Sequence, residues 1–574
     1  MNKTHECLTS ETQTSKVKTE RPLAFSVYSV AVLTALVTFC VYLPALFNDF
    51  VNLDDYVYVV FNQKIASFGV ELFRSSFLDF IAELWIPLTW ISLAIDHAIW
   101  GLNPLGYHLT NNILHACNSF FVAVLAARLV TAWDESRGCD VEKTFSISHN
   151  AVALTAGLLF GIMPLHVESV AWVTERKDVL NAFFALPALV MYLGYVQSHK
   201  ESGSANIRFS DRRYLSVLAL FLLSLLSKSM TVTFPVVLLI IDWFPLRRFT
   251  DDKPIIPILL EKVPFLLGSL LVGVITLIAQ QGTMQSFEFA SPMTRLLVAG
   301  KALIFYLWKM VWPSGLMPFY VHPGNSISLL SLEYFLPLIL VLMISGFCIW
   351  SVFTRRTTIL PAVWLFYLIT IFPVLGFSQS GPQAMADRFA YFPSLGPIIL
   401  AAVCANLLYG SCAKSIGNLK LLKSGTIVVV CLILAGYGFV TLRMIQVWHN
   451  TETLWTRVID LEPMQSGRAY FERGQHYVNA GAFEKSLPDL QISLDIANRK
   501  NFKSIHKIYS LRGDAYLGMS RYQESIEDFS QAIRLAPEPK SEYYSSRGNA
   551  FQKAGKEEEA RRDLDLAEKL NQRH

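Results

Sequence analysis

Long apolar runs recur from residue 24 to residue 442, and they constrain the fold of this chain more than any other feature. The hydrocarbon core of a bilayer is about 30 Å thick, so a crossing helix needs about 20 apolar residues. The runs therefore predict an all-α, polytopic membrane helical bundle with about eleven spans. The expected spans are 24–47, 108–131, 151–165, 178–197, 214–227, 230–244, 263–280, 333–353, 359–376, 393–410 and 425–442.

Composition agrees with that fold class. Hydrophobic residues make up 53% of the chain and charged residues 16%, whereas a soluble globular protein has about 25% charged residues. The same figures exclude a fibrous or disordered protein. A formal net charge of +4 over 574 residues gives no reason to expect a nucleic-acid partner.

The distribution of Lys and Arg predicts the orientation. With the N-terminal tail, residues 1–23, in the cytoplasm, eleven spans leave 19 Lys and Arg on the cytoplasmic side and 9 on the other side. The positive-inside rule favours this arrangement. We therefore expect a multi-pass membrane domain over 24–450, in a bacterial inner membrane or an endoplasmic reticulum membrane, with the C-terminal domain outside the cytoplasm.

Three short segments are interpreted separately. Residues 294–312 are apolar but contain three cations, which are costly in a lipid-facing span, so we place them at a membrane interface. Residues 227–229, Ser-Lys-Ser, are interpreted as a tight turn at the membrane surface between two spans. Between 70 and 80, Val and Phe recur every three or four residues, which predicts an amphipathic helix lying on the membrane.

Residues 465–574 carry three repeated units. In each unit, aromatic and small residues follow one another at offsets of 4, 3, 9, 4 and 3, starting from Tyr470, Tyr509 and Tyr544. This is the tetratricopeptide repeat (TPR) pattern, in which small residues lie where two helices touch and aromatic residues fill the gaps. The pattern predicts an α-solenoid whose concave surface binds a protein or peptide.

Two adjacent carboxylates, Asp54 and Asp55, follow the first span on the non-cytoplasmic side. One carboxylate of such a pair can be held ionised as a general base while the other binds or positions. We take both residues as candidate catalytic groups. The alternative is that they only cap the loop.

Residues 164–178 place six ionisable groups between two apolar spans. His166 and Glu168 are close enough in the sequence to face one cavity, which an acceptor would enter. Arg176 and Lys177 are candidates for binding a phosphate. The alternative is a solvated loop that is rich in charge.

Arg388 lies about five residues before a late span, within reach of a lipid head group. The planar fork of an arginine binds two phosphate oxygens at once, which makes Arg388 a candidate for the same role. The alternative is an anchoring salt bridge with Asp387.

Polar residues also form a stripe at the start of the second span. His108 and Asn112 belong to it, and with Asn111 and His115 they fall on one face of a helix. Such a stripe looks either into a cavity, as an acceptor contact, or onto a partner helix.

The combination indicates a class of chemistry. Acidic residues for base chemistry and basic residues for phosphate, beside the membrane and outside the cytoplasm, fit transfer of a group from a membrane-bound phospholipid carrier. The chain has no P-loop and no dinucleotide fingerprint, so a cytosolic nucleotide donor is not indicated. The eight cysteines suggest no disulfide framework or zinc site, and no metal cofactor is indicated.

Several long motifs resemble a known family. The chain is similar to bacterial-type members of the TMTC family, membrane proteins with C-terminal TPRs that are related to the protein O-mannosyltransferases of the GT-C class. The similarity covers about residues 24–574. The motifs that carry it are NLDD after the first span, PLHVESVAWVTERKDVL, LLSKSMTVTFPVVLLIIDWFPL, YLWKMVWPSGLMPFYVHPG and QAMADRFAYFPSLG.

The resemblance implies a GT-C fold and an inverting glycosyltransferase. It also implies a polyprenyl- or dolichyl-phosphate sugar donor, with mannose as the expected sugar, and a protein acceptor outside the cytoplasm. By this match Asp54 is the base, Asp55 is its neighbour or an acceptor contact, and Arg388 binds the phosphate of the lipid.

Two other classes of protein compete with this interpretation. One is a non-catalytic membrane scaffold that uses its TPRs to assemble envelope proteins. The other is a transporter of lipid-linked sugars. A scaffold does not need the acidic pair beside the membrane, and a transporter is expected to place its ionisable residues near the bilayer midplane.

Overall fold

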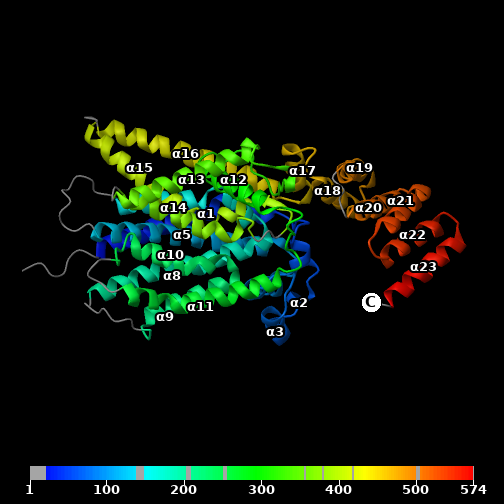
Figure 1. Cartoon of the computed structure of the whole chain (residues 1–574), viewed down its shortest axis with the longest axis horizontal. Helices are drawn as coiled ribbons and strands as arrows, with labels where there is room; N and C mark the ends of the chain where they lie inside the picture. Colours follow the sequence, from blue (N-terminus) through cyan, green and yellow to red (C-terminus); the bar gives the residue numbers. More distant parts are fainter. Residues whose placement is uncertain are drawn as a thin grey trace, which may run out of the picture.

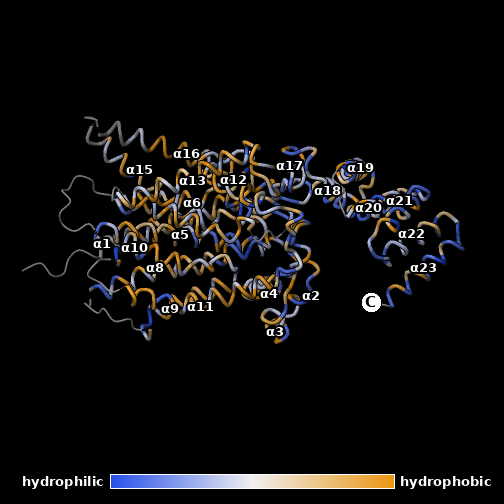
Figure 2. Tube along the Cα trace, in the orientation of Figure 1, coloured by the Kyte–Doolittle hydropathy of each residue, from blue (hydrophilic) through white to orange (hydrophobic). Residues whose placement is uncertain are grey.

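The protein is a bundle of long helices from which a smaller helical arm extends at one end (Figure 1). The computed structural model describes residues 21–136, 148–201, 209–249, 255–354, 357–377, 381–415, 419–499 and 504–572. The tail predicted over 1–23 therefore lies, up to residue 20, outside the described residues. Apolar residues dominate the bundle and polar residues the arm (Figure 2). The predicted all-α bundle followed by TPRs is confirmed.

Each of the eleven predicted apolar runs contains a helix of the bundle. In chain order they are α1 (Arg21–Val41), α2 (Gln63–Ala66), α3 (Val70–Leu78), α4 (Pro87–Trp100), α5 (Pro104–Ser136), α6 (His149–Gly161), α7 (Val167–Ala171), α8 (Arg176–Glu201), α9 (Arg212–Ser227), α10 (Phe234–Trp243), α11 (Ile255–Ala279), α12 (Pro292–Val311), α13 (Leu332–Phe353), α14 (Ile359–Ile371), α15 (Leu395–Ser415) and α16 (Leu419–Val447). The helices α2, α3, α4, α7 and α12 lie outside those runs. Two short strands, β1 (Tyr320–Val321) and β2 (Gln383–Met385), pair antiparallel.

The number of full-length spans is smaller than predicted. Within the described residues, seven helices are long and apolar enough to cross a membrane, or eight if the bent pair of α6 and α7 is one span. The other three predicted spans correspond to α9, α10 and α14, which have 16, 10 and 13 residues. At 1.5 Å per residue these helices reach at most about 24 Å. The count of eleven, and the orientation that depends on it, therefore stay predictions.

The chain between α6 and α8 does not form one straight helix. A 49° bend separates α6 from the segment Pro164–Ala171, and a further 3₁₀ turn, η4 (Val173–Glu175), leads into α8. The polar stripe of α5 supports this irregular backbone. The Asn111 Nδ2 donates to the carbonyl oxygens of Val170 and Trp172 at 3.1 and 3.2 Å. Helix packing, the alternative to a cavity, therefore explains the central part of the stripe.

The segment 227–229 separates two helices, as the sequence had suggested, and its position at a membrane surface stays a prediction. Lys228 separates α9 from a 3₁₀ turn that leads into α10, but its ammonium group is mostly buried and contacts two carboxylates. Lys228 pairs with Glu175 and Asp178 because an unpaired cation is costly inside an apolar bundle.

Two other predicted segments form helices. The amphipathic segment is α3, in which Leu72 is buried while Phe73 and Phe77 are exposed. Residues 294–312 form α12, which packs against α13, and a Cβ at Gly300 would meet Leu338 at 2.9 Å. Their contact with a membrane stays a prediction.

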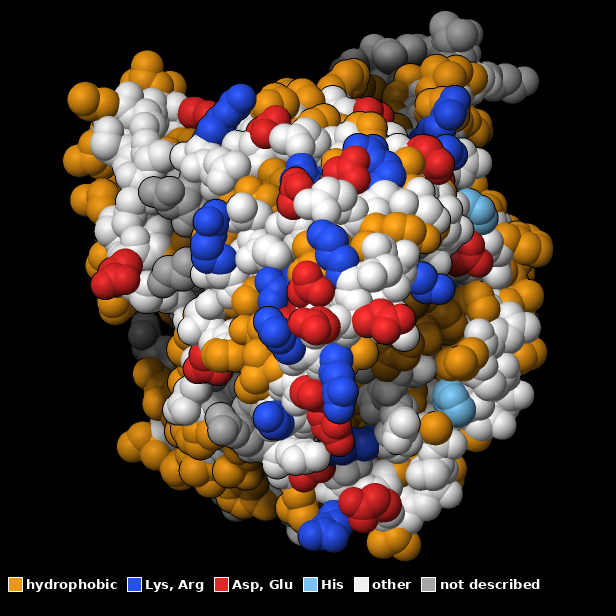
Figure 3. Space-filling view, turned by 90° about the vertical axis from the view of Figure 1, so that its right-hand side faces the viewer, with side chains coloured by type: hydrophobic (Ala, Val, Ile, Leu, Met, Phe, Trp, Pro, Cys, Tyr) orange, Lys and Arg blue, Asp and Glu red, His pale blue; other side chains and the backbone are white. Residues whose placement is uncertain are grey.

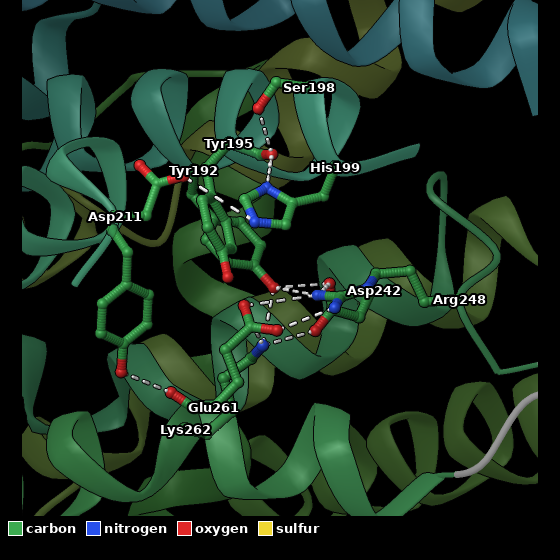
Figure 4. Close-up of polar contacts among 10 residues, drawn as sticks. Tyr192, Tyr195, Ser198, His199, Asp211, Asp242, Arg248, Glu261 and Lys262 are labelled. Carbon is green, nitrogen blue, oxygen red and sulfur yellow. Dashed lines mark hydrogen bonds and ion pairs between the residues drawn. The ribbon is translucent and has the colours of Figure 1, made fainter. Parts of the chain in front are cut away.

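A network of buried charges joins α8, α10 and α11 (Figure 4). The Asp242 side chain is 0% exposed; it pairs with Arg248 at 3.0 Å and with Lys262 at 2.8 Å, and it accepts a hydrogen bond from the Tyr192 hydroxyl at 2.6 Å. Glu261 pairs with the same two cations. Because α8 begins at Arg176 and Tyr192 is 16 residues later, this network lies about 24 Å from the start of α8.

The arm consists of packed helix pairs. Each of the three predicted units is one pair, and a Cβ added at the glycine of the second unit, Gly513, would meet Phe529 at 3.0 Å, as the TPR pattern requires. The helices of the arm are α17 (Thr451–Leu461), α18 (Gly467–Asn479), α19 (Phe483–Arg499), α20 (Ile505–Gly518), α21 (Tyr522–Leu535), α22 (Ser541–Lys553) and α23 (Glu557–Asn571).

We expect Asp242→Asn to destabilise the bundle by about 3 kcal/mol, because it leaves the buried network with one uncompensated cation. Thermal unfolding in detergent measures the change. The matched control is Asp79→Asn, which breaks the Lys64–Asp79 pair whose side chains are 48% and 47% exposed; it should cost less than about 1 kcal/mol. Equal losses in the two variants would contradict a structural role for the network.

Candidate active site

The two adjacent aspartates lie in the loop after η1 (Leu43–Phe47), and they differ in burial and in hydrogen bonding. Asp55 is 1% exposed, and its two carboxylate oxygens accept backbone hydrogen bonds from Thr174 at 3.1 Å and from Val51 at 3.0 Å. Asp54 is partly exposed, and no side chain of the described residues pairs with it. Asp55 thus holds the loop against η4, while the Asp54 carboxylate is free to meet another molecule.

The environment of Asp55 favours its protonated form. Burial raises the pKa of Asp55 to about 7, although the backbone amides of Val51 and Thr174 lower it, and the charge of Asp54 adds to the rise. A buried carboxyl with both oxygens in use is a poor candidate for a base that must reach an acceptor. The loop-capping alternative therefore describes Asp55, and Asp54 is the better candidate of the pair.

Six charged side chains from three parts of the chain form a second feature, a cluster of ion pairs. We call it the Glu175 cluster. The Glu175 carboxylate lies 2.9 Å from Lys177 Nζ, 3.3 Å from Lys228 Nζ and 3.2 Å from Arg388 Nε. Lys228 also lies 2.6 Å from Asp178. The sixth member is Glu168, which pairs with Arg388. Three carboxylates and three cations therefore balance one another.

Arg388 joins the two acidic parts of this cluster. Its guanidinium pairs with Glu168 and Glu175, its backbone N–H donates to Glu168 Oε2 at 3.0 Å, and its Cζ lies 5.3 Å from the centroid of the Trp172 ring. Burial lowers the pKa of Arg388, but the charges of Glu168 and Glu175 raise it above its ordinary value. Arg388 therefore pairs with Glu168 and Glu175 and does not form the alternative salt bridge with Asp387.

Asp387 binds a different partner. Its Oδ1 accepts a hydrogen bond from the Tyr320 hydroxyl at 2.8 Å, and burial together with the charge of Glu168 raises the pKa of the Asp387 carboxyl. The β1–β2 pairing brings these two residues together, because Tyr320 lies opposite Met385. Because Asp387 binds Tyr320, Arg388 pairs with the carboxylates of the Glu175 cluster.

Arg176 points away from the Glu175 cluster. It is completely buried; Nη2 pairs with Asp96 at 2.6 Å and donates to the carbonyl of Tyr107 at 2.8 Å, while Nη1 donates to Ser92 Oγ at 2.8 Å. Nε donates to Asn111. Four of the five N–H donors of Arg176 are thus used inside the bundle, and the guanidinium is completely buried, so Arg176 is a poorer candidate for binding a phosphate than its neighbour Lys177.

The three remaining candidates are buried in the bundle. His166 Nδ1 contacts the carbonyl of Phe160 at 2.8 Å and its Nε2 contacts Ser394 Oγ at 3.0 Å, so His166 does not share a cavity with Glu168. His108 is 1% exposed. Asn112 Nδ2 donates to the carbonyl of Phe39 at 3.2 Å. These positions favour helix packing over acceptor binding.

Tyr58 connects the free aspartate with the Glu175 cluster. Burial raises its pKa, and the charges of Asp54 and Glu175 raise it further, which places both carboxylates within electrostatic range of one hydroxyl. Lys177 Nζ lies 5.3 Å from the centroid of the Tyr58 ring. The geometry agrees, because Asp55 accepts from the amide of Thr174, one residue before Glu175, so the loop that carries Asp54 lies next to the cluster.

Sequence reasoning missed Lys228, and it did not use Glu175 and Asp178 as site residues. The signal for Lys228 was present, since a single cation between two apolar runs is costly unless it is paired. Nowhere in the described ranges do three or more His, Cys, Asp or Glu side chains form a group that could hold a metal ion.

Comparison with known proteins gives two kinds of match. The tetratricopeptide repeat family matches residues 506–539, the second predicted unit. The protein O-mannosyl-transferase Tmtc3 of Drosophila melanogaster is 24% identical over 512 residues, which cover 79% of this chain and 52% of that protein. The chain is a relative of the TMTC proteins. The resemblance predicted from the motifs is thus confirmed.

Other relatives agree. TMTC3 of Mus musculus is 23% identical over 500 residues, covering 79% of this chain and 49% of that protein. The chain therefore spans about half the length of the curated relatives it matches, and its own apolar helices make it a multi-pass membrane protein. Among solved structures, ArnT from Cupriavidus metallidurans bound to undecaprenyl phosphate aligns with a TM-score of 0.31 and 14% identity, over 88% of this chain and 81% of that chain.

The environment of Asp55 predicts a pH-dependent stability. Its pKa rises from 3.8 to about 7 on folding, so its contribution is fully present below about pH 4 and is lost as the pH rises through about 7. Asp55→Asn removes this titration. We expect the stability of the wild type relative to the variant to increase by about 2 kcal/mol between about pH 7.5 and about pH 5. Thermal unfolding at both pH values measures it, and a pH-independent difference would contradict the assignment.

Proposed function

We propose that this TMTC relative is a membrane glycosyltransferase that moves a sugar, mannose by family resemblance, from a polyprenyl- or dolichyl-phosphate donor to a protein acceptor outside the cytoplasm. The observation that carries the proposal is the unpaired Asp54 carboxylate on a loop that Asp55 joins to η4, next to the three cations of the Glu175 cluster, and that Asn52 joins to the TPR arm.

Asp54 is proposed as the base. A hydroxyl acceptor is a poor nucleophile until its proton is removed, and a positioned carboxylate can take that proton as the hydroxyl oxygen attacks the sugar. Attack from the face opposite the phosphate inverts the anomeric carbon, and the lipid phosphate leaves. Asp54 suits this role because it is partly exposed and its loop is held by Asp55 on one side.

The cations of the Glu175 cluster are proposed to bind the donor phosphate. Lys177, Lys228 and Arg388 approach Glu175 from separate elements, so an anion that enters among them meets positive charge from three directions. Arg388 offers the fork that suits two phosphate oxygens. Donor binding then exchanges one of its carboxylate partners for phosphate, which compensates the desolvation of the lipid phosphate.

The acceptor is proposed to approach along the arm. Viewed onto that end of the molecule, acidic and basic side chains interleave along a band rather than separating into large patches of one sign (Figure 3). A TPR surface of this kind suits a protein segment of mixed polarity better than a strongly charged polymer. The distribution of Lys and Arg in the sequence predicts that this end of the molecule lies outside the cytoplasm.

Asp54→Asn should reduce sugar transfer by about 10²–10⁴-fold, because the amide cannot accept the acceptor proton. Transfer of label from a radiolabelled polyprenyl-phosphate sugar to periplasmic or lumenal protein measures it. The matched control is Asp49→Asn, an exposed aspartate of the same loop, which should leave transfer unchanged. Near-normal turnover in Asp54→Asn would remove Asp54 as the base.

Arg388→Lys should weaken donor binding by about tenfold, since it keeps the charge but loses the planar fork. Titration of the purified protein with a short-chain polyprenyl-phosphate sugar measures the dissociation constant. Lys64→Gln, at an exposed ion pair in the first loop, is the control. If Arg388→Ala also binds the donor with unchanged affinity, Arg388 does not contact the phosphate.

A further inference from the structure

The loop that carries Asp54 is bound to the repeat arm by residues about 400 positions away in the sequence. Asn52 makes most of these contacts: its backbone N–H donates to Thr451 Oγ1 at 3.1 Å, its Oδ1 accepts from Trp455 Nε1 at 2.8 Å, and its Nδ2 donates to the carbonyl of Glu472 at 3.0 Å. The backbone amide and both polar side-chain atoms of Asn52 thus form hydrogen bonds with residues of α17 and α18.

Asp54 therefore lies between two fixed neighbours. Asn52 is held by the arm, and Asp55 is held by the amides of Val51 and Thr174. The Asp54 side chain itself has no partner in the part of the chain that the structure describes. Its position follows from these neighbours rather than from contacts of its own.

The same helix, α17, also contacts the phosphate side of the candidate site. Arg457 Nε donates to the carbonyl of Leu316 at 3.1 Å, in the loop that precedes β1. The loop leads into β1, where the Tyr320 hydroxyl donates to Asp387, the residue next to Arg388. One helix of 11 residues thus touches the base loop with Trp455 and the phosphate loop with Arg457.

A repeated arginine connects α17 to the rest of the arm. Arg473 forms a two-pronged pair with Asp489 at 2.7 Å, and its Nη1 donates to Thr456 of α17 at 3.0 Å. Arg547 repeats this arrangement in the third unit, with Asp563 at 2.7 Å and Ser530 at 3.0 Å. Each unit is therefore fixed to the helix before it, so displacement along the arm reaches α17.

We propose that α17 couples the TPR arm to both halves of the candidate active site, with Asn52 as the positioning residue for Asp54. The proposal rests on the proposed function of Asp54 and extends it: the arm is a wall of the catalytic site as well as a surface for an acceptor protein. An acceptor bound to the arm acts on the base through the Asn52 contacts.

Backbone hydrogen exchange of residues 49–56 in the full-length protein tests the coupling without any use of activity. We expect Trp455→Phe, which removes the indole N–H and keeps an aromatic ring, to accelerate exchange there by about fivefold. Asn52→Ala should accelerate it further. Thr451→Val is a second, nearly isosteric variant in case Trp455→Phe folds poorly. Lys569→Gln, at an exposed side chain of α23 that takes no part in these contacts, is the control and should leave exchange in 49–56 unchanged.

Kinetics then test positioning. In an active enzyme, Asn52→Ala should lower kcat by about tenfold with the donor KM within about twofold, because the base is displaced while the phosphate contacts remain. Unchanged exchange in Trp455→Phe, Thr451→Val and Asn52→Ala overturns the coupling, and unchanged kcat in an active Asn52→Ala enzyme overturns Asn52 as the positioning residue. If the wild type transfers no sugar while exchange accelerates as expected, the coupling stands and the proposed function fails.

Discussion

Charge pairing around the buried carboxylate of Glu175 is the interaction on which the rest of this site depends. Removing an ion from water costs several kcal/mol unless another charge compensates it. Lys177, Lys228 and Arg388 therefore have to converge, although they belong to α8, to the break between α9 and α10, and to the loop before α15. The pairing holds the start of α8, the break between α9 and α10 and the loop before α15 together at one point.

The irregular backbone beside the cluster depends on a second set of polar groups. Non-helical backbone inside a membrane protein needs partners for its carbonyl and amide groups. Asn111 supplies them between α7 and η4, and Asn118 Nδ2 donates to the carbonyl of Val179 at 2.9 Å. The polar stripe on α5 is therefore what permits α6 and α8 to be separated by a bent segment that presents charged side chains.

The sequence predicted the helices well and the partners of the polar residues poorly. Apolar runs identify helices because lipid or core contact requires them, whatever the neighbours are. The choice between Arg176 and Lys177 depended on which way each side chain turns from the start of α8, and adjacent residues of a helix point about 100° apart. Likewise Asp54 and Asp55 differ only through contacts with Thr174 and Val51, which no local pattern encodes.

The spacing of the two charged networks bears on how substrates reach the site. Lys177 belongs to the Glu175 cluster and Tyr192 to the network around Asp242, and 15 residues of α8 separate them, about 22 Å. That is less than the roughly 30 Å of a bilayer's hydrocarbon core. At least one network therefore lies below the lipid head groups. Under the proposed function, a Glu175 cluster at that depth would receive the lipid-linked donor sideways from the bilayer, while the arm contacts the Asp54 loop through Asn52.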